Sequence, residues 1–275
     1  MKKVVSMISL AAAMWTAAPA CAQDVSGDRV TVNFSDRSRT GLLKVNLFNG
    51  GITVKSHSGN DVIVESRSSN DRNRTRPSTT PDGLRRIDTN ATGLIIEEEN
   101  NVMTVTTRSF NRSGGLEIQV PAKTNLNLRA VNGGDIVVEG VEGDIEVTNT
   151  NGGVVLNNVA GSVVAHANNG RVTATLRDIT PNKPMSFTSM NSSVDITLPP
   201  TVKANLKMRT DNGEAYSDFD IQLRPSAPPT REDLRGRGGR FRIQTDRTIN
   251  GTINGGGPDF EVRTLNGNIY IRKAK

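Results

Sequence analysis

The sequence predicts an all-β protein in which short strands stack as a β-solenoid. Glycine recurs every nine residues between Gly134 and Gly170, and aliphatic residues alternate with other residues behind each glycine. Asparagine precedes glycine at positions 133, 152 and 170, so the pattern also repeats about every 18 or 19 residues. A fixed period of this kind is typical of repeat architectures, in which each unit buries its apolar side only by stacking on its neighbours.

The nine-residue unit has the periodicity of a strand with one buried side. Five units run from residue 134 to residue 174, each with aliphatic residues at its third and fifth positions, such as Ile136 and Val138. Because the side chains of a strand alternate between its two faces, these residues point the same way. A glycine at the start of each unit permits a positive φ in the preceding turn. The expected turn glycines are Gly134, Gly143, Gly152, Gly161 and Gly170, with Gly267 in a looser copy near the C-terminus.

Two strand units form one structural repeat, because Asn-Gly turns alternate with other turns. In a solenoid, each strand pairs with its mate about 18 residues along the chain. An antiparallel meander, folded as a sandwich, is the alternative, because Asn-Gly is also a strong signal for a hairpin turn. Strict spacing favours the solenoid. In that fold Asn132, Asn151 and Asn169 stack at one corner and hydrogen-bond through their side chains, and Asn266 is a further turn residue.

The pattern divides the chain into three parts. Residues 1–22 read as a signal peptide, residues 23–120 as an irregular β region, and residues 121–275 as the regular repeat domain, with a boundary near Pro121. Two polar, basic, proline-containing segments interrupt the pattern at residues 66–86 and 225–242. Both are expected to be loops outside the body of strands.

The first 22 residues predict export. Lys2 and Lys3 precede an apolar run that is too short for a membrane span. Ala20-Cys21-Ala22 fits a signal-peptidase site. The mature chain is therefore expected to begin near Gln23 and to have no transmembrane segment. The periplasm is the expected destination. Release from the cell, or a lipid anchor at Cys21, are the alternatives. Without Cys21 the mature chain has no cysteine, which excludes disulfides and thiol chemistry.

Charge and motifs exclude several classes of function. The chain has 34 basic and 28 acidic residues, and loss of two lysines with the signal peptide takes the net charge from +6 to +4, too mild for a nucleic-acid-binding protein. Asp135 and Asp144 are better explained as turn or surface residues than as a glycosidase pair. No calcium repeat is evident, and His57 and His166 form no zinc motif. We therefore expect no catalytic residue, metal or cofactor.

The basic segments are the candidate binding surface. Arginine recognises phosphate and carboxylate groups through paired hydrogen bonds, so anionic polymers of the cell envelope are plausible partners, as are exported proteins. The candidate residues are Arg72, Arg74, Arg76, Arg235, Arg237, Arg240 and Arg242.

Several stretches resemble the bacterial putative-adhesin domain, a family of β-strand repeats of unknown function. They are "VNGGDIVVEGVEGDIEVTNTNGGVVL", "NSSVDITLP", "TDNGEAYSDF" and, most specifically, "GGGPDFEVRTLNGNIYIRK", which together extend from about residue 125 to the C-terminus, with a vaguer match back to Val45. The resemblance implies a right-handed, β-helix-like solenoid, and it carries over no catalytic residue or defined ligand. Ser192 and Ser193 depart from the family's turn pattern and leave the geometry of that turn open.

The sequence thus predicts a non-enzymatic exported protein with a structural or binding role in the envelope, adhesion included. Two alternatives remain open. One is a polysaccharide-acting enzyme on the same scaffold, which would need several charged residues converging in one groove. The other is an envelope-stress sensor or regulator that binds an exported partner through the basic loops.

Overall fold

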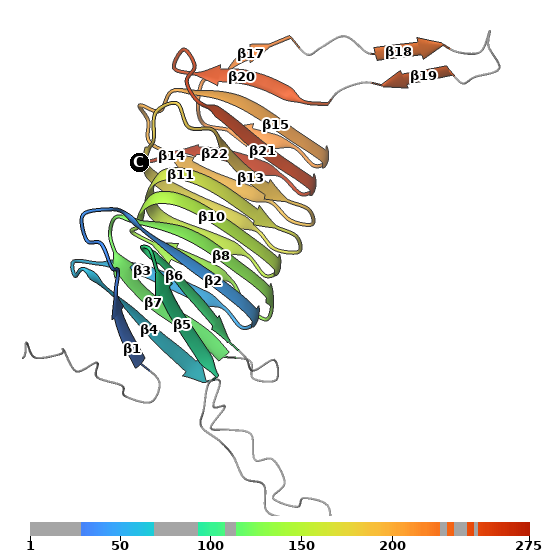
Figure 1. The fold of residues 1–275 in the computed structure, drawn as a ribbon. Coiled ribbons are helices and arrows are strands. Elements are labelled where there is room, and N and C mark those ends of the chain that lie inside the picture. Colours follow the sequence, from blue (N-terminus) through green and yellow to red (C-terminus); the bar gives the residue numbers. More distant parts are fainter. Residues whose placement is uncertain (1–28, 69–92, 108–113, 226–229, 234–240, 245–246) are drawn as a thin grey trace, which may run out of the picture.

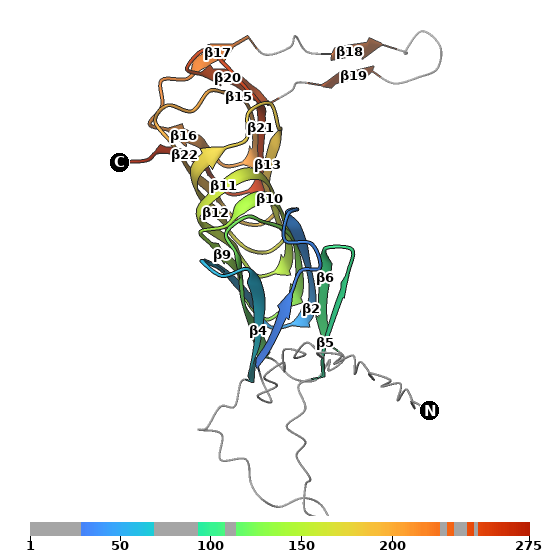
Figure 2. The same cartoon turned by 60° about the vertical axis from the view of Figure 1, so that its left-hand side comes forward.

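The structure, a computed structural model, describes residues 29–68, 93–107, 114–225, 230–233, 241–244 and 247–275 of the 275-residue chain. Every regular element in these residues is a β-strand (Figure 1). Twenty strands form one sheet, and β18 (Thr230–Asp233) and β19 (Phe241–Gln244) form a separate pair. The large sheet is curled, so that two sides face each other across the core (Figure 2). The described residues contain no helix, and therefore no helix long and apolar enough to cross a membrane.

Side A of the sheet contains the first strand of each coil, where a coil is two consecutive strands joined at a corner. In spatial order, side A consists of β5 (Leu94–Glu99), β6 (Val102–Thr107), β2 (Gly41–Asn49), β8 (Thr124–Asn132), β10 (Glu142–Asn151), the second half of β11 (Val154–Ala167), β13 (Met185–Ser189), β21 (Asp259–Asn266), β15 (Ala204–Asn212), β20 (Ile249–Ile253) and β17 (Gln222–Arg224).

Side B contains the second strand of each coil. In the same direction it consists of β1 (Arg29–Asn33), β4 (Asp61–Ser68), β7 (Gly114–Pro121), β3 (Ile52–His57), β9 (Ile136–Glu139), the first half of β11, β12 (Val172–Ile179), β14 (Val194–Leu198), β22 (Ile269–Lys273) and β16 (Ala215–Ser217).

Neighbouring coils pair in parallel. Ile145 lies beside Leu126 on one side and Val163 on the other, and the corner asparagines of successive coils in this region are 19, 18 and 22 residues apart. This is the pairing of a strand with its repeat-mate, and the antiparallel meander is therefore wrong for the central array. Antiparallel pairs are confined to the ends of the sheet and to β18–β19.

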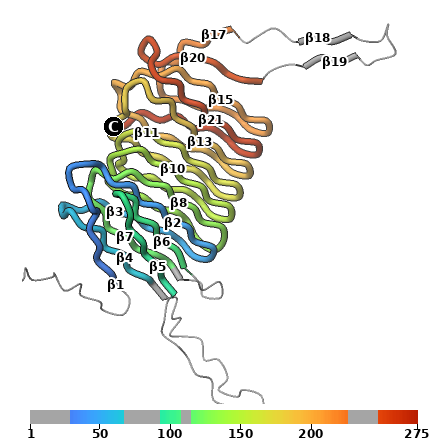
Figure 3. The backbone as a smooth tube through the Cα atoms, viewed as in Figure 1, coloured from blue at the N-terminus to red at the C-terminus, as the bar shows by residue number. Residues whose placement is uncertain are grey.

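The order of coils along the sheet departs from the order in the sequence at both ends (Figure 3). The C-terminal coil, β21 and β22, lies between the β13–β14 coil and the β15–β16 coil. The first coil, β2 and β3, lies between the β6–β7 coil and the β8–β9 coil. Strands on both sides of residue 121 therefore belong to one continuous sheet.

The core is a narrow layer of aliphatic side chains between the two sides. Ile136, Val138, Ile145 and Val147, at the third and fifth positions of their units, are at most 2% exposed. Removing such side chains from water supplies the main favourable term in folding, and a coil can do so only against the coils beside it.

A ladder of asparagine side chains runs along one corner. Each Nδ2 donates a hydrogen bond to the Oδ1 of the preceding coil: Asn151 to Asn132 (2.7 Å), Asn169 to Asn151 (2.7 Å), Asn191 to Asn169 (2.7 Å), Asn266 to Asn191 (3.0 Å) and Asn212 to Asn266 (2.8 Å). The ladder follows the spatial order of the coils, so it passes through the inserted C-terminal coil. Asn191 occupies its place although Ser192 follows it instead of glycine.

A second row of polar side chains lies just inside the ladder and binds the corner carbonyls. Asn149, which is 1% exposed, donates to the carbonyl oxygens of Gly134 and Gly153, both at 2.9 Å. The hydroxyl groups of three further residues donate the equivalent hydrogen bond to a corner carbonyl of the preceding coil: Ser189, Thr264 and Thr210. Ser189 and Thr264 are at most 1% exposed. Buried carbonyl groups at each corner thereby obtain the partners that burial requires.

The turn glycines are needed mainly for space, which corrects the expectation of positive φ. Of the six glycines expected at turns, only Gly161 has a positive φ, at 121°. A Cβ on Gly152 would lie 2.1 Å from the carbonyl oxygen of Gly134, and one on Gly170 would lie 2.1 Å from that of Gly152. Corners that stack at the spacing of paired strands, about 4.8 Å, leave no room for a side chain there.

The basic segments expected as loops are only partly described. Residues 69–92, 226–229 and 234–240 lie outside the described residues, as does the signal peptide at residues 1–22. Within 225–242 the structure places β18 and the start of β19, which pair antiparallel beyond the end of the large sheet (Figure 1). This hairpin is an addition to the loop that the sequence predicts.

Replacing Asn151 by alanine tests whether the ladder stabilises the fold. The change removes the hydrogen bonds to Asn132 and Asn169, and for exposed amides we expect a loss of about 1 kcal/mol and a fall in Tm of about 2–4 °C. Asn157→Ala, an exposed asparagine on β11 away from the corner, is the matched control and should leave Tm unchanged. Equal melting of both variants and the parent chain would contradict a stabilising role.

Replacing Gly152 by alanine tests the close approach of the corners. Because the new Cβ would overlap a backbone carbonyl, the corner must open, and we expect a loss of at least about 3 kcal/mol or failure to fold. Gly115→Ala is the control, since its Cβ would meet only the Gly51 carbonyl oxygen at 3.4 Å. Circular dichroism during thermal unfolding measures both; similar Tm values would refute the steric requirement.

Candidate ligand-binding hollow on side A

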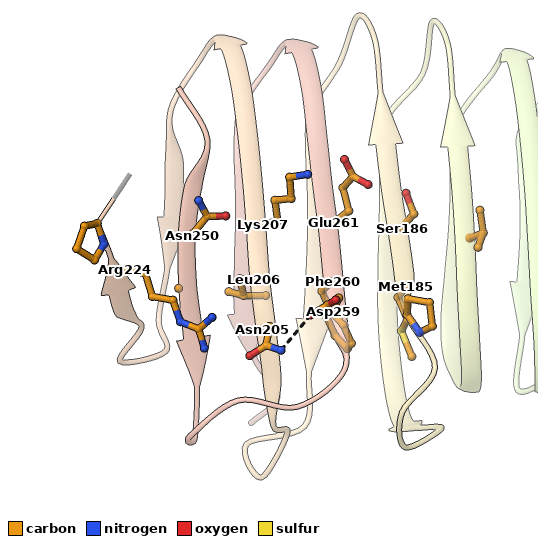
Figure 4. Close-up of a pocket in the computed structure, with 14 residues that line it drawn as sticks. Met185, Ser186, Asn205, Leu206, Lys207, Arg224, Asn250, Asp259, Phe260 and Glu261 are labelled. Atoms are coloured by element: carbon orange, nitrogen blue, oxygen red, sulfur yellow. Dashed lines mark hydrogen bonds between the residues drawn. The ribbon is translucent and has the colours of Figure 1, made fainter. Parts of the chain in front are cut away.

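A hollow of about 560 Å³ lies on side A near the C-terminal end of the array (Figure 4). Its walls combine segments that are far apart in the sequence, because β21 lies between β13 and β15. The lining residues are Val164, Pro184, Met185, Ser186, Asn205, Leu206, Lys207, Arg224, Pro225, Asn250, Gly251, Asp259, Phe260 and Glu261.

Five of these residues form a polar row across five strands. The strand registers place Glu261 between Ser186 and Lys207, and Asn250 between Lys207 and Arg224. Lys207, Glu261 and Arg224 are exposed. Among the described residues, neither Lys207 nor Glu261 makes an ion pair within 4.0 Å, so their charged ends face solvent. A ligand can therefore contact both without displacing an existing partner.

A second, shorter row is already ordered by internal hydrogen bonds. The Nδ2 of Asn205 donates to Asp259 Oδ1 at 3.0 Å and to the Gly257 carbonyl oxygen at 2.7 Å (Figure 4). These bonds fix the amide and the carboxylate beside the Lys207–Glu261 row. Oxygen atoms of both remain as acceptors for a ligand hydroxyl.

Apolar groups complete the hollow. Val164, which is 46% exposed, lies next to Ser186 in the strand register, and Pro184 precedes β13. Two charged residues of each sign lie in the lining, Lys207 and Arg224 against Asp259 and Glu261. The net charge of the hollow is close to zero, and its side chains suit hydroxyl groups and apolar ring faces more than a polyanion.

The carboxylates of the hollow lack the setting of a hydrolytic pair. Asp259 and Glu261 lie two residues apart on β21 and so point to the same side. Both are exposed, whereas a general acid needs a desolvated carboxyl group with a raised pKa. The chemistry that this arrangement supports is hydrogen bonding, rather than proton transfer.

A second polar hollow of about 640 Å³ lies at the starts of the side A strands of earlier coils, around β8 and β10. It contains two exposed ion pairs, Lys183 with Asp144 at 2.7 Å and Arg177 with Glu142 at 3.6 Å. Exposed pairs of this kind contribute little to stability. Because four of its charged side chains are already paired within the chain, this hollow is a weaker candidate for binding.

The structure separates Asp135 from Asp144. Asp135 lies at the corner and accepts a hydrogen bond from the Gly153 amide at 2.6 Å, while Asp144 lies beyond the four residues of β9. That strand spans roughly 13 Å, more than a carboxylate pair for glycoside hydrolysis allows. Asp135 makes the backbone bond expected of a turn aspartate.

The two histidines have separate surroundings. His57 binds the 57–61 turn, with Nε2 2.7 Å from the Asp61 carbonyl oxygen and the Gly59 amide donating to Nδ1 at 3.1 Å. His166 lies on side A between Thr148 and Thr188. In the described part of the chain, no three His, Cys, Asp or Glu side chains are grouped as metal ligands.

Most of the arginines proposed from the sequence lie outside the described residues, so that prediction stays a prediction. Arg72, Arg74, Arg76, Arg235, Arg237 and Arg240 lie outside the described residues, and Arg242 lies in β19 opposite Glu232 without a described side chain. The sequence reasoning missed the hollow. Its only local signal is alternation of exposed polar residues, as in Asn205-Leu-Lys207 and Asp259-Phe-Glu261, which many solvent-facing strands share.

Comparison with known proteins gives a partial likeness. No family model and no curated protein matches the chain. A solved structure of a putative cell adhesion protein from Clostridium sporogenes matches over 90% of this chain and 99% of its own, with 9% identity and a TM-score of 0.46. A putative adhesin from Bacteroides fragilis matches over 90% and 98%, with 10% identity and a TM-score of 0.27. The functional proposals therefore rest on this chain's own residues.

Proposed function

We propose that the protein is a non-enzymatic binding protein of the cell envelope, and that the hollow on side A binds a polysaccharide of low net charge. The observation that carries this proposal is the row Ser186–Glu261–Lys207–Asn250–Arg224, which five strands hold in register beside the ordered pair Asn205–Asp259. Amide, ammonium and carboxylate groups at strand spacing are suited to the regularly placed hydroxyl groups of a sugar chain.

The scaffold supports a binding role. Strand pairing fixes the backbone positions of these residues, so the spacing of the groups is set before a ligand binds. Only the rotamers of the exposed side chains have to be ordered on binding. The array also exposes a long surface on which a polymer can make repeated weak contacts, which raises its overall affinity. Adhesion through such a surface is one form of this proposal.

The finer description of the fold is part of the proposal. We infer a right-handed β-solenoid, because parallel strands joined by crossover connections are right-handed in nearly all proteins. Export through residues 1–22 places it in the periplasm or beyond. The arginines of residues 66–86 and 225–242 then extend binding to anionic groups of the same envelope polymers.

Titration of the full chain with sugar polymers tests the ligand class. Isothermal titration with dextran, alginate and polyphosphate compares a neutral polysaccharide, an acidic polysaccharide and an anion without sugar. We expect dextran to bind more tightly than alginate. We also expect a loss of about tenfold in dextran affinity for Lys207→Ala or Glu261→Gln, each of which removes a charge-assisted hydrogen bond.

Lys44→Ala is the matched control. Lys44 is an exposed lysine on β2, in the same row of side A but at the other end of the array. Its removal should leave affinity within about twofold, since only the C-terminal coils form the hollow. Equal losses in both lysine variants, or binding of polyphosphate alone, would reject the hollow as a polysaccharide site.

Protease treatment of cells that express the full chain tests the compartment. We expect the protein to resist protease on intact cells and to be digested after permeabilisation of the outer membrane. Digestion on intact cells would move it to the cell surface and favour adhesion, whereas protection until the cytoplasm is opened would contradict export.

A further inference from the structure

The only two tyrosines of the chain stack on each other on the outer face of side B. Tyr216 in β16 and Tyr270 in β22 are register partners, with ring centroids 5.4 Å apart and ring planes 10° from parallel. Aromatic residues make up only 4% of the sequence, so this pair is a concentration of ring surface in a protein that otherwise has little.

An arginine covers the far side of Tyr270. The guanidinium of Arg272 lies 5.2 Å from the Tyr270 ring centroid. It donates two hydrogen bonds to Asp195, from Nε to Oδ1 at 2.7 Å and from Nη2 to Oδ2 at 3.0 Å. Asp195 is the register partner of Tyr270 on β14. The guanidinium therefore lies on the β14 side of the ring and Tyr216 on the other, which gives a stack of Arg272, Tyr270 and Tyr216.

Tyr216 ends the stack with an open ring face. Its strand, β16, pairs with β22 and has no second neighbour among the strand pairings of the described residues. Tyr216 is 47% exposed. The outer ring face thus lies at a sheet edge. There the backbone groups of Ala215 and Ser217, which alternate with those directed at β22, point away from β22, where an added strand can pair with them.

The charge around this open face is negative. The Tyr216 hydroxyl donates a hydrogen bond to Glu214 Oε2, which raises the pKa of the phenol, so the ring stays neutral and electron-rich. Asp218 follows β16, and its carboxylate accepts a hydrogen bond from the Lys273 amide at 3.2 Å, so Glu214 is the carboxylate beside the ring. Of the nearby cations, Arg272 is paired with Asp195, and Lys273 lies over Phe219 at 5.1 Å. No described lysine or arginine lies within 4.0 Å of the Glu214 carboxylate.

We propose that the outer face of Tyr216, with Glu214 beside it, binds the guanidinium group of an arginine in an extended peptide that adds to the edge of β16. The chain already stacks a guanidinium on a tyrosine one position away, so the proposed contact repeats an interaction that the fold contains. A guanidinium matches both the ring face and the carboxylate, and an extended peptide matches the open strand edge. This site is separate from the hollow on side A and does not depend on a sugar ligand.

Nuclear magnetic resonance of the full chain with ¹³C-labelled tyrosine tests the proposal, because two tyrosines give two sets of ring signals. The probe is a blocked pentapeptide with arginine at its centre, flanked by valine and threonine. A peptide with citrulline in place of arginine is the neutral control of the same shape. We expect the arginine peptide to shift the Tyr216 signals more than those of Tyr270, and the citrulline peptide to bind at least about fivefold more weakly.

Two variants separate the ring face from the hydroxyl group. Tyr216→Leu removes the ring and should weaken binding by about fivefold or more, while Tyr216→Phe keeps the ring and should stay within about threefold of the parent. Glu214→Gln should weaken binding and reduce its dependence on salt. Thermal unfolding and far-UV circular dichroism confirm that each variant is folded. The Tyr270 signals cannot serve as this control in Tyr216→Leu, because loss of the stacked ring shifts them by itself.

The proposal is overturned by equal binding of the citrulline and arginine peptides, by unchanged affinity of Tyr216→Leu, or by ring shifts confined to Tyr270. Absence of any shift at millimolar peptide would also overturn it.

Discussion

The close stacking of corners is the constraint on which the rest of the structure depends. Asn151 and Gly152 show its two requirements. The Asn151 side chain hydrogen-bonds to the coils on both sides, and Gly152 lacks the Cβ atom that would overlap the carbonyl oxygen of Gly134. Asn149, Ser189 and Thr264 then satisfy the carbonyl groups that this approach buries. With the corners fixed, the strands on sides A and B are set at the spacing of a hydrogen-bonded sheet, and their inner residues meet in the core.

Regularly spaced rows of outward side chains follow from that constraint. On each strand, alternate residues face solvent, and parallel registry lines them up across many coils, as with Lys207 and Glu261 on side A or Tyr216 and Tyr270 on side B. A small core of aliphatic residues leaves little room for a deep, desolvated pocket in which a carboxyl or histidine would acquire an unusual pKa.

Both candidate surfaces lie where the coil order departs from the sequence. The β21–β22 coil enters between two coils that precede it in the chain, and it contributes Asp259 and Glu261 to one side and Tyr270 and Arg272 to the other. The last residues of the chain are thus internal to the array, and their placement completes the hollow and the aromatic stack together. Folding of the C-terminal end and formation of both surfaces are therefore coupled.

The sequence by itself determined the local architecture. The alternation at Ile136 and Val138 and the glycines at the corners define strands and the all-β class, because each is a property of residues near one another in the chain. The spacing of Asn132, Asn151 and Asn169 favours parallel neighbours, which the structure then confirms. The tertiary structure decided which coils are neighbours at the ends. Coils with the same pattern have the same corners and the same apolar side, so nothing local marks Asn191 or Asn212 as the partner of the C-terminal coil. In the structure, Asn266 of that coil hydrogen-bonds to both. The hollow and the tyrosine stack depend on which coils lie beside the C-terminal coil. Its neighbours lie 75 and 54 residues away in the sequence, so both surfaces form only in the folded chain.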